Sequence, residues 1–161
     1  MNFGAMISKT NLFWVPLPLV IGLVTPSAII FCLEVFVAHI SPVAAILDIS
    51  RRQFAEGHNL FLLAVLGLFP FVLLSVSIIV ASRHLSASRV GCLTIGGLIG
   101  ILAFMVPSHI GVWYPLYGGG HMSSTAVIAF LFIPFYCIPT LVIGIIIGWA
   151  VSFLPLRRHA P

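Results

Sequence analysis

The sequence predicts an all-α integral membrane protein with four transmembrane helices, because its composition, its apolar runs and its basic residues agree. Of 161 residues, 61% are hydrophobic and 6% are charged, whereas soluble domains average about 45–50% and about 25%. A chain this apolar lacks the polar surface that must surround a soluble core. We therefore expect one membrane domain over residues 1–161, with the lipid bilayer as its main solvent.

Four apolar runs define the expected transmembrane helices. Crossing a hydrocarbon layer of about 30 Å takes about 20 residues, with a range of about 17–25. The runs are Leu12 to Val37, Leu60 to Ala81, Val90 to Val106, and Thr125 to Leu154. The third is the shortest, and we expect it to end at Pro107. Proline removes a helical donor and therefore predicts a kink, and the prolines inside the runs are Pro16, Pro18, Pro26, Pro70, Pro134 and Pro139. In the long fourth run we expect a bend at Pro134 and Pro139.

The basic residues predict how these helices are oriented. Lysine and arginine accumulate in cytoplasmic loops. With the amino terminus inside, five of the seven basic residues lie in the cytoplasm: Lys9, Arg83, Arg89, Arg157 and Arg158. The other two, Arg51 and Arg52, lie outside. Both ends are therefore expected inside, as in a multi-pass protein of the bacterial inner membrane.

The first outer loop carries the pattern of a short amphipathic helix. Ser41 is a typical N-cap, Pro42 suits the first helical position, and Gly57 suits the end. Apolar residues lie near one face: Val43, Ile46, Leu47 and Phe54. Charged residues lie on the other, with i,i+4 pairing of Asp48 with Arg52 and of Arg52 with Glu56. We expect a helix over residues 42–56 that lies on the outer membrane surface or caps the bundle.

Two pairs of glycines recur at four-residue spacing, Gly96 with Gly100 and Gly144 with Gly148. Small residues at this spacing let two helix backbones approach closely in lipid. The pattern predicts either close packing within the chain or contact between two copies of it.

The second outer loop, Ser108 to Ser124, is rich in aromatic residues and glycine. Its candidate binding residues are Trp113, Tyr114, Tyr117, Gly119 and His121. Tryptophan and tyrosine suit the membrane interface, where the ring is apolar and its tip is polar. They therefore either anchor the loop at the interface or form a recognition surface, and glycine permits a tight turn there.

Glu34 is the only acidic residue inside an apolar run. An ionised carboxylate is costly in lipid, so such a residue usually has a partner or a functional role. Glu34 can anchor the first helix at the interface, make a structural hydrogen bond, or form a proton or cation site.

Metal binding and catalysis have little support in the sequence. His109 and His121 fall in the second outer loop and form a candidate metal pair, but the chain has no H-x-x-x-H or H-E-x-x-H motif. The three cysteines, Cys32, Cys92 and Cys137, lie singly inside apolar runs, as small buried residues do. The sequence identifies no cofactor and contains no catalytic motif, which favours a non-enzymatic protein.

The leading hypothesis is a membrane protein that acts by binding another membrane component, as an immunity, accessory or assembly factor. The expected partner is a membrane protein or a second copy of the chain, and scattered basic residues exclude a nucleic-acid partner. The alternative is a small transporter or channel subunit that uses Glu34 in a polar path. In general layout the chain is similar to the membrane immunity proteins that protect bacteria from pore-forming toxins, a likeness of architecture alone.

Overall fold

The computed structural model describes residues 13–55, 59–121 and 126–154. Within these ranges the chain is all-helical and has no strand. Its six described helices are α2 (Pro16–Phe36), α3 (Pro42–Arg52), α4 (Leu60–Gly67), α5 (Phe69–Ala81), α6 (Ala87–Tyr117) and α7 (Ala126–Val151). Several residues used in the sequence predictions lie outside the described ranges: Lys9, Glu56, Gly57, Thr125, Arg157 and Arg158.

Three of these helices, α2, α6 and α7, are long and apolar enough to cross a membrane. Helices α4 and α5 meet at a bend of 42° and together make a possible fourth span. This bend confirms the kink predicted from Pro70. Pro70 lies in the first turn of α5, where the missing N–H costs no hydrogen bond within that helix. The helices are consistent with a multi-pass membrane protein, the class that the composition predicts.

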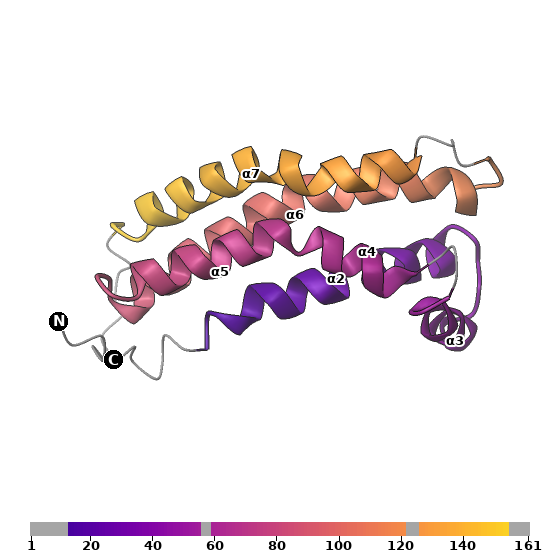
Figure 1. The fold of residues 1–161 in the computed structure, drawn as a ribbon, viewed down its shortest axis with the longest axis horizontal. Helices are drawn as coiled ribbons and strands as arrows, with labels where there is room; N and C mark the ends of the chain where they lie inside the picture. Colours follow the sequence, from indigo (N-terminus) through magenta and orange to yellow (C-terminus); the bar gives the residue numbers. More distant parts are fainter. Residues whose placement is uncertain (1–12, 56–58, 122–125, 155–161) are drawn as a thin grey trace.

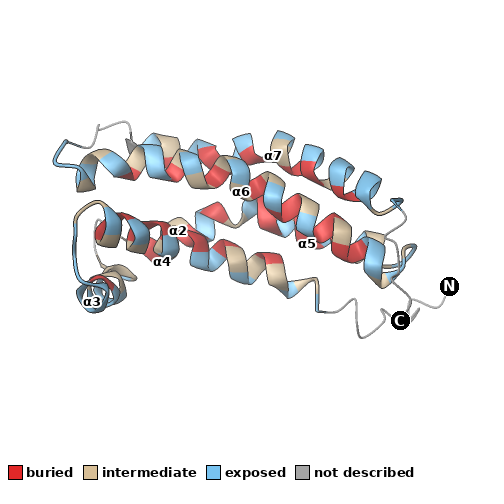
Figure 2. Cartoon of the chain, turned by 180° about the vertical axis from the view of Figure 1, so that it is seen from behind, coloured by how far each residue is buried: buried red, intermediate tan, exposed pale blue. Residues whose placement is uncertain are grey.

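The long helices run along one axis, and α3 lies across one end of them (Figure 1). Helix α2 begins, and α7 finishes, at the opposite end of the molecule. Buried residues line the contacts between helices, while the outward faces are largely exposed (Figure 2). The fully buried core side chains include Ile30, Phe71, Ile78, Ile101 and Met105. We call the two ends of the bundle the α3 end and the opposite end.

The expected end of the third helix at Pro107 is wrong. Helix α6 begins at Ala87 and continues through Pro107 and Pro115 to Tyr117. Packing along α7 holds α6 helical, and a membrane bundle tolerates the carbonyl groups that proline leaves free. The connection after α6 consequently begins at Gly118, which removes most of the predicted second loop.

The predicted surface helix exists but is shorter than expected, since α3 ends at Arg52. Its N-cap is confirmed, because the Ser41 hydroxyl accepts a hydrogen bond from the Ala44 N–H at 3.4 Å.

The glycine pairs pack α6 against α7 within the chain. A Cβ placed on Gly100 would meet the carbonyl oxygen of Thr140, and one on Gly144 would meet that of Gly96. These obstacles are backbone atoms and cannot rotate away. The prediction of close packing within the chain is therefore confirmed.

Candidate functional site

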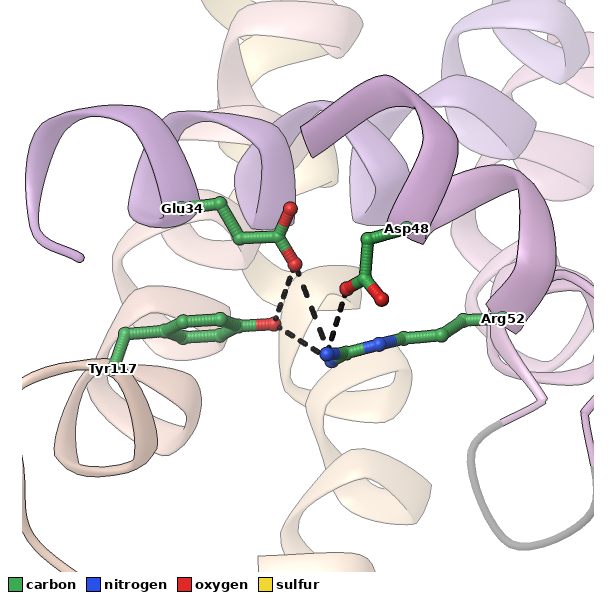
Figure 3. Close-up of polar contacts among 4 residues, drawn as sticks. All are labelled: Glu34, Asp48, Arg52 and Tyr117. Atoms are coloured by element: carbon green, nitrogen blue, oxygen red, sulfur yellow. Dashed lines mark hydrogen bonds and ion pairs between the residues drawn. The ribbon is translucent and has the colours of Figure 1, made fainter. Parts of the chain in front are cut away.

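Four polar side chains from three helices meet at the α3 end and form what we call the Glu34 cluster (Figure 3). Glu34 comes from the last turn of α2, and Tyr117 is the last residue of α6. Asp48 and Arg52 stand one turn apart on α3. The cluster therefore forms where α3 crosses the end of the bundle.

The Arg52 guanidinium is the centre of the cluster. Its Nη2 lies 2.6 Å from Asp48 Oδ2, so the i,i+4 pair predicted from the sequence is confirmed. Its Nη1 donates to the Tyr117 hydroxyl at 3.2 Å and lies 4.0 Å from Glu34 Oε1. The Tyr117 hydroxyl in turn donates to Glu34 Oε1 at 3.4 Å. A single cation thus faces two carboxylates and a phenol.

Burial differs sharply across the cluster. The Glu34 side chain is 0% exposed, whereas those of Arg52 and Asp48 are 31% and 37% exposed. Glu34 Oε2 has no hydrogen-bond partner among the described residues. Burying a charged group without full pairing is costly, so the ionised form of Glu34 is the least favourable of the charged groups in the cluster.

Helix α3 meets the bundle through polar side chains and through Ala45 and Ile49, and its remaining apolar side chains are exposed. Besides the contacts of Arg52, the Gln53 Nε2 donates to the Ser27 hydroxyl of α2 at 3.1 Å. Val43 and Leu47 are 70% and 54% exposed, and Ile46 and Phe54 are exposed as well. The predicted apolar stripe is thus exposed, and α3 caps the bundle through polar contacts together with the buried Ala45 and the partly buried Ile49.

The candidate binding residues of the predicted second loop do not form one surface. Trp113 and Tyr117 turn inward from α6, whereas Tyr114 is 53% exposed. Gly119 has a left-handed φ of 83°, which glycine adopts without strain, and His121 is exposed. Of these candidate binding residues and Glu34, the structure joins Glu34 and Tyr117 by a hydrogen bond.

A second polar feature lies inside the bundle. His109 and Trp113 are buried two turns and one turn before Tyr117 on α6, and the Phe130 ring of α7 packs against both rings, with centroids 5.3 and 5.1 Å away. His109 Nδ1 and Trp113 Nε1 lack hydrogen-bond partners in the described part of the chain. The i,i+4 spacing of residues 109, 113 and 117 indicates this row, but only once the helix is known to continue past Pro107.

The structure adds no further ligand to the candidate metal pair among the described residues. In the described ranges no group of three or more His, Cys, Asp or Glu side chains is placed to hold a metal ion. His109 is buried in the bundle, while His121 is exposed beyond the end of α6. A site formed by this pair stays a prediction.

No protein family, characterised protein or solved structure shows significant similarity to the chain.

Proposed function

We propose that this chain is a non-enzymatic membrane protein with four spans and both ends in the cytoplasm, which acts by binding another membrane protein through α3. The observation that carries the proposal is the orientation of α3. Arg52 and the following Gln53 are bonded to the bundle, while Val43, Ile46 and Leu47 are exposed on the other side of the helix.

The contacts of α3 favour a protein partner over the bilayer alone. An interfacial helix normally keeps a polar face toward water while its apolar face enters lipid. Arg52 and Gln53 on the polar side of α3 are instead bonded to Tyr117 and Ser27 of the bundle. Those contacts hold the exposed apolar residues in a fixed arrangement, and a preorganised surface loses less entropy on binding.

Photo-crosslinking in native membranes tests the proposal. A photoreactive phenylalanine analogue at Phe54, which is exposed beside α3, should yield one discrete protein adduct. Leu47→Asp should remove that adduct, because a charge enters the apolar contact, whereas Ser50→Asp on an exposed position of α3 should retain it. Crosslinks to lipid alone, or equal adducts in both variants, would contradict the proposal.

The alternative function, a small transporter or channel subunit, is favoured by one observation, the complete burial of Glu34. The two functions respond to different changes. Transport should be abolished by Glu34→Gln and should survive Leu47→Asp. Partner binding should instead be lost in Leu47→Asp.

A further inference from the structure

The Glu34 cluster holds more negative than positive charge when all its groups are ionised. Glu34 and Asp48 contribute two negative charges, and Arg52 contributes one positive charge. Among the described residues, the other titratable groups on neighbouring elements do not restore the balance. Tyr117 is a neutral phenol, His109 lies two turns further along α6, and Arg51 and His39 are exposed.

Helices α4 and α5, which pack against α2, also supply no balancing charge. Their sequences, LFLLAVLG and FPFVLLSVSIIVA, contain no charged residue. Two carboxylates that share one cation in a poorly solvated site do not both ionise readily, and one of them tends to keep a proton.

The geometry decides which carboxylate carries the proton. Asp48 lies 2.6 Å from Arg52 Nη2 and is partly solvated, and both features stabilise its ionised form. Glu34 is fully buried, lies 4.0 Å from the nearest guanidinium nitrogen and accepts one long hydrogen bond. Its Oε2 is unpartnered among the described residues, so a proton there would remove a buried charge without breaking a bond.

We propose that Glu34 is a proton-binding site, which holds one proton at neutral pH and exchanges it with water past the α3 side chains Asp48 and Arg52. Proton uptake converts the carboxylate to a carboxylic acid, and the proton comes from and returns to water. In the protonated state Arg52 and Asp48 form a balanced ion pair. A sodium ion is disfavoured at the same place, because the Arg52 guanidinium lies beside both carboxylates and would repel it.

Carbon-13 NMR of the full chain in lipid nanodiscs tests this site directly. The chain contains only two glutamates, Glu34 and Glu56, so a ¹³Cδ-glutamate label gives two carboxyl signals, which Glu56→Gln assigns. At pH 7 the Glu34 signal should have the shift of a carboxylic acid, and raising the pH should move it to the carboxylate position. A Glu34 signal that is already that of a carboxylate at pH 7 would overturn the proposal.

Asp48→Asn provides the matched test of the charge argument. With its competitor removed, Arg52 becomes available to Glu34, and the Glu34 signal at pH 7 should move to the carboxylate position. Replacing sodium by N-methylglucamine should leave the wild-type signal unchanged. An unaltered Glu34 signal in Asp48→Asn would contradict the charge argument, and a wild-type signal that depends on sodium would contradict the assignment of a proton to this site.

Discussion

The Tyr117 hydroxyl donates to Glu34 Oε1 at 3.4 Å and joins α6 to α2 across 83 sequence positions. The same hydroxyl accepts a hydrogen bond from Arg52 Nη1 at 3.2 Å. A phenol can donate and accept at once, so this one group connects three helices. The position of α3 over the end of the bundle therefore depends on an atom of α6.

Tyr117→Phe should loosen α3 without unfolding the bundle. The substitution removes both hydrogen bonds of the hydroxyl and keeps the ring, and a bond to a charged group contributes about 1.5–3 kcal/mol. Hydrogen exchange of the α3 amides should therefore become faster. Tyr114→Phe is the control, since Tyr114 is exposed on the same helix, and equal exchange in the two variants would show that the hydroxyl does not hold α3.

Arg52→Gln should release α3 more completely than Arg51→Gln. Arg52 faces both carboxylates of the cluster, whereas its neighbour Arg51 is exposed. Loss of the guanidinium removes the ion pair with Asp48 and the hydrogen bond to the Tyr117 hydroxyl, so α3 loses the contact that ties it to α6. Limited proteolysis of α3 in nanodiscs measures this, and similar cleavage rates for the two variants would be the contrary result.

The sequence predicts the helices well because the apolar runs and the caps are local signals. Ser41 and Pro42 mark the start of α3, and Pro70 marks the bend before α5. Pro107 misleads, because proline usually ends a helix in water, whereas α6 continues through it along α7. The extra turns bring Tyr117 onto the helical face that it shares with Trp113 and His109.

The candidate site was only partly predictable for a related reason. Glu34 stands out as a lone acid in an apolar run, and the i,i+4 spacing of Asp48 and Arg52 indicates their ion pair. The contact of Arg52 with Glu34 depends instead on how α3 folds back over α2, which no local pattern specifies. The charged face of an amphipathic helix is expected to meet water, but here part of it meets the bundle.

His109→Leu should maintain or raise stability. His109 is buried, and its Nδ1 has no hydrogen-bond partner among the described residues. An unsatisfied buried polar atom costs about 1–3 kcal/mol, and leucine, which is of similar size, removes it. Thermal unfolding in detergent should show an unchanged or higher Tm. A clear decrease would mean that the imidazole has a partner in the membrane.

Cysteine labelling in a variant without the three native cysteines should define the sidedness of the bundle. Ser50 on α3 and Gly120 after α6 are exposed at the α3 end, and Ser86 is exposed at the opposite end. An impermeant maleimide should label the Ser50→Cys and Gly120→Cys variants from the outside, and the Ser86→Cys variant only from the cytoplasmic side. Labelling of all three from one side would exclude the four-span topology.

Two glycine substitutions on α6 should change stability in opposite directions. Alanine in a helix interior is favoured over glycine by about 0.5–1 kcal/mol, and a Cβ on Gly111 would meet nothing within 4 Å. Gly111→Ala should therefore stabilise the bundle slightly.

Gly100 is the opposite case, because a Cβ there would meet the Thr140 carbonyl oxygen of α7. Helices α6 and α7 must then separate, and overpacking of this kind costs about 1–3 kcal/mol. Gly100→Ala should consequently lower Tm while Gly111→Ala raises it. A rise in Tm for Gly100→Ala as well would show that the α6–α7 contact is looser than these backbone positions imply.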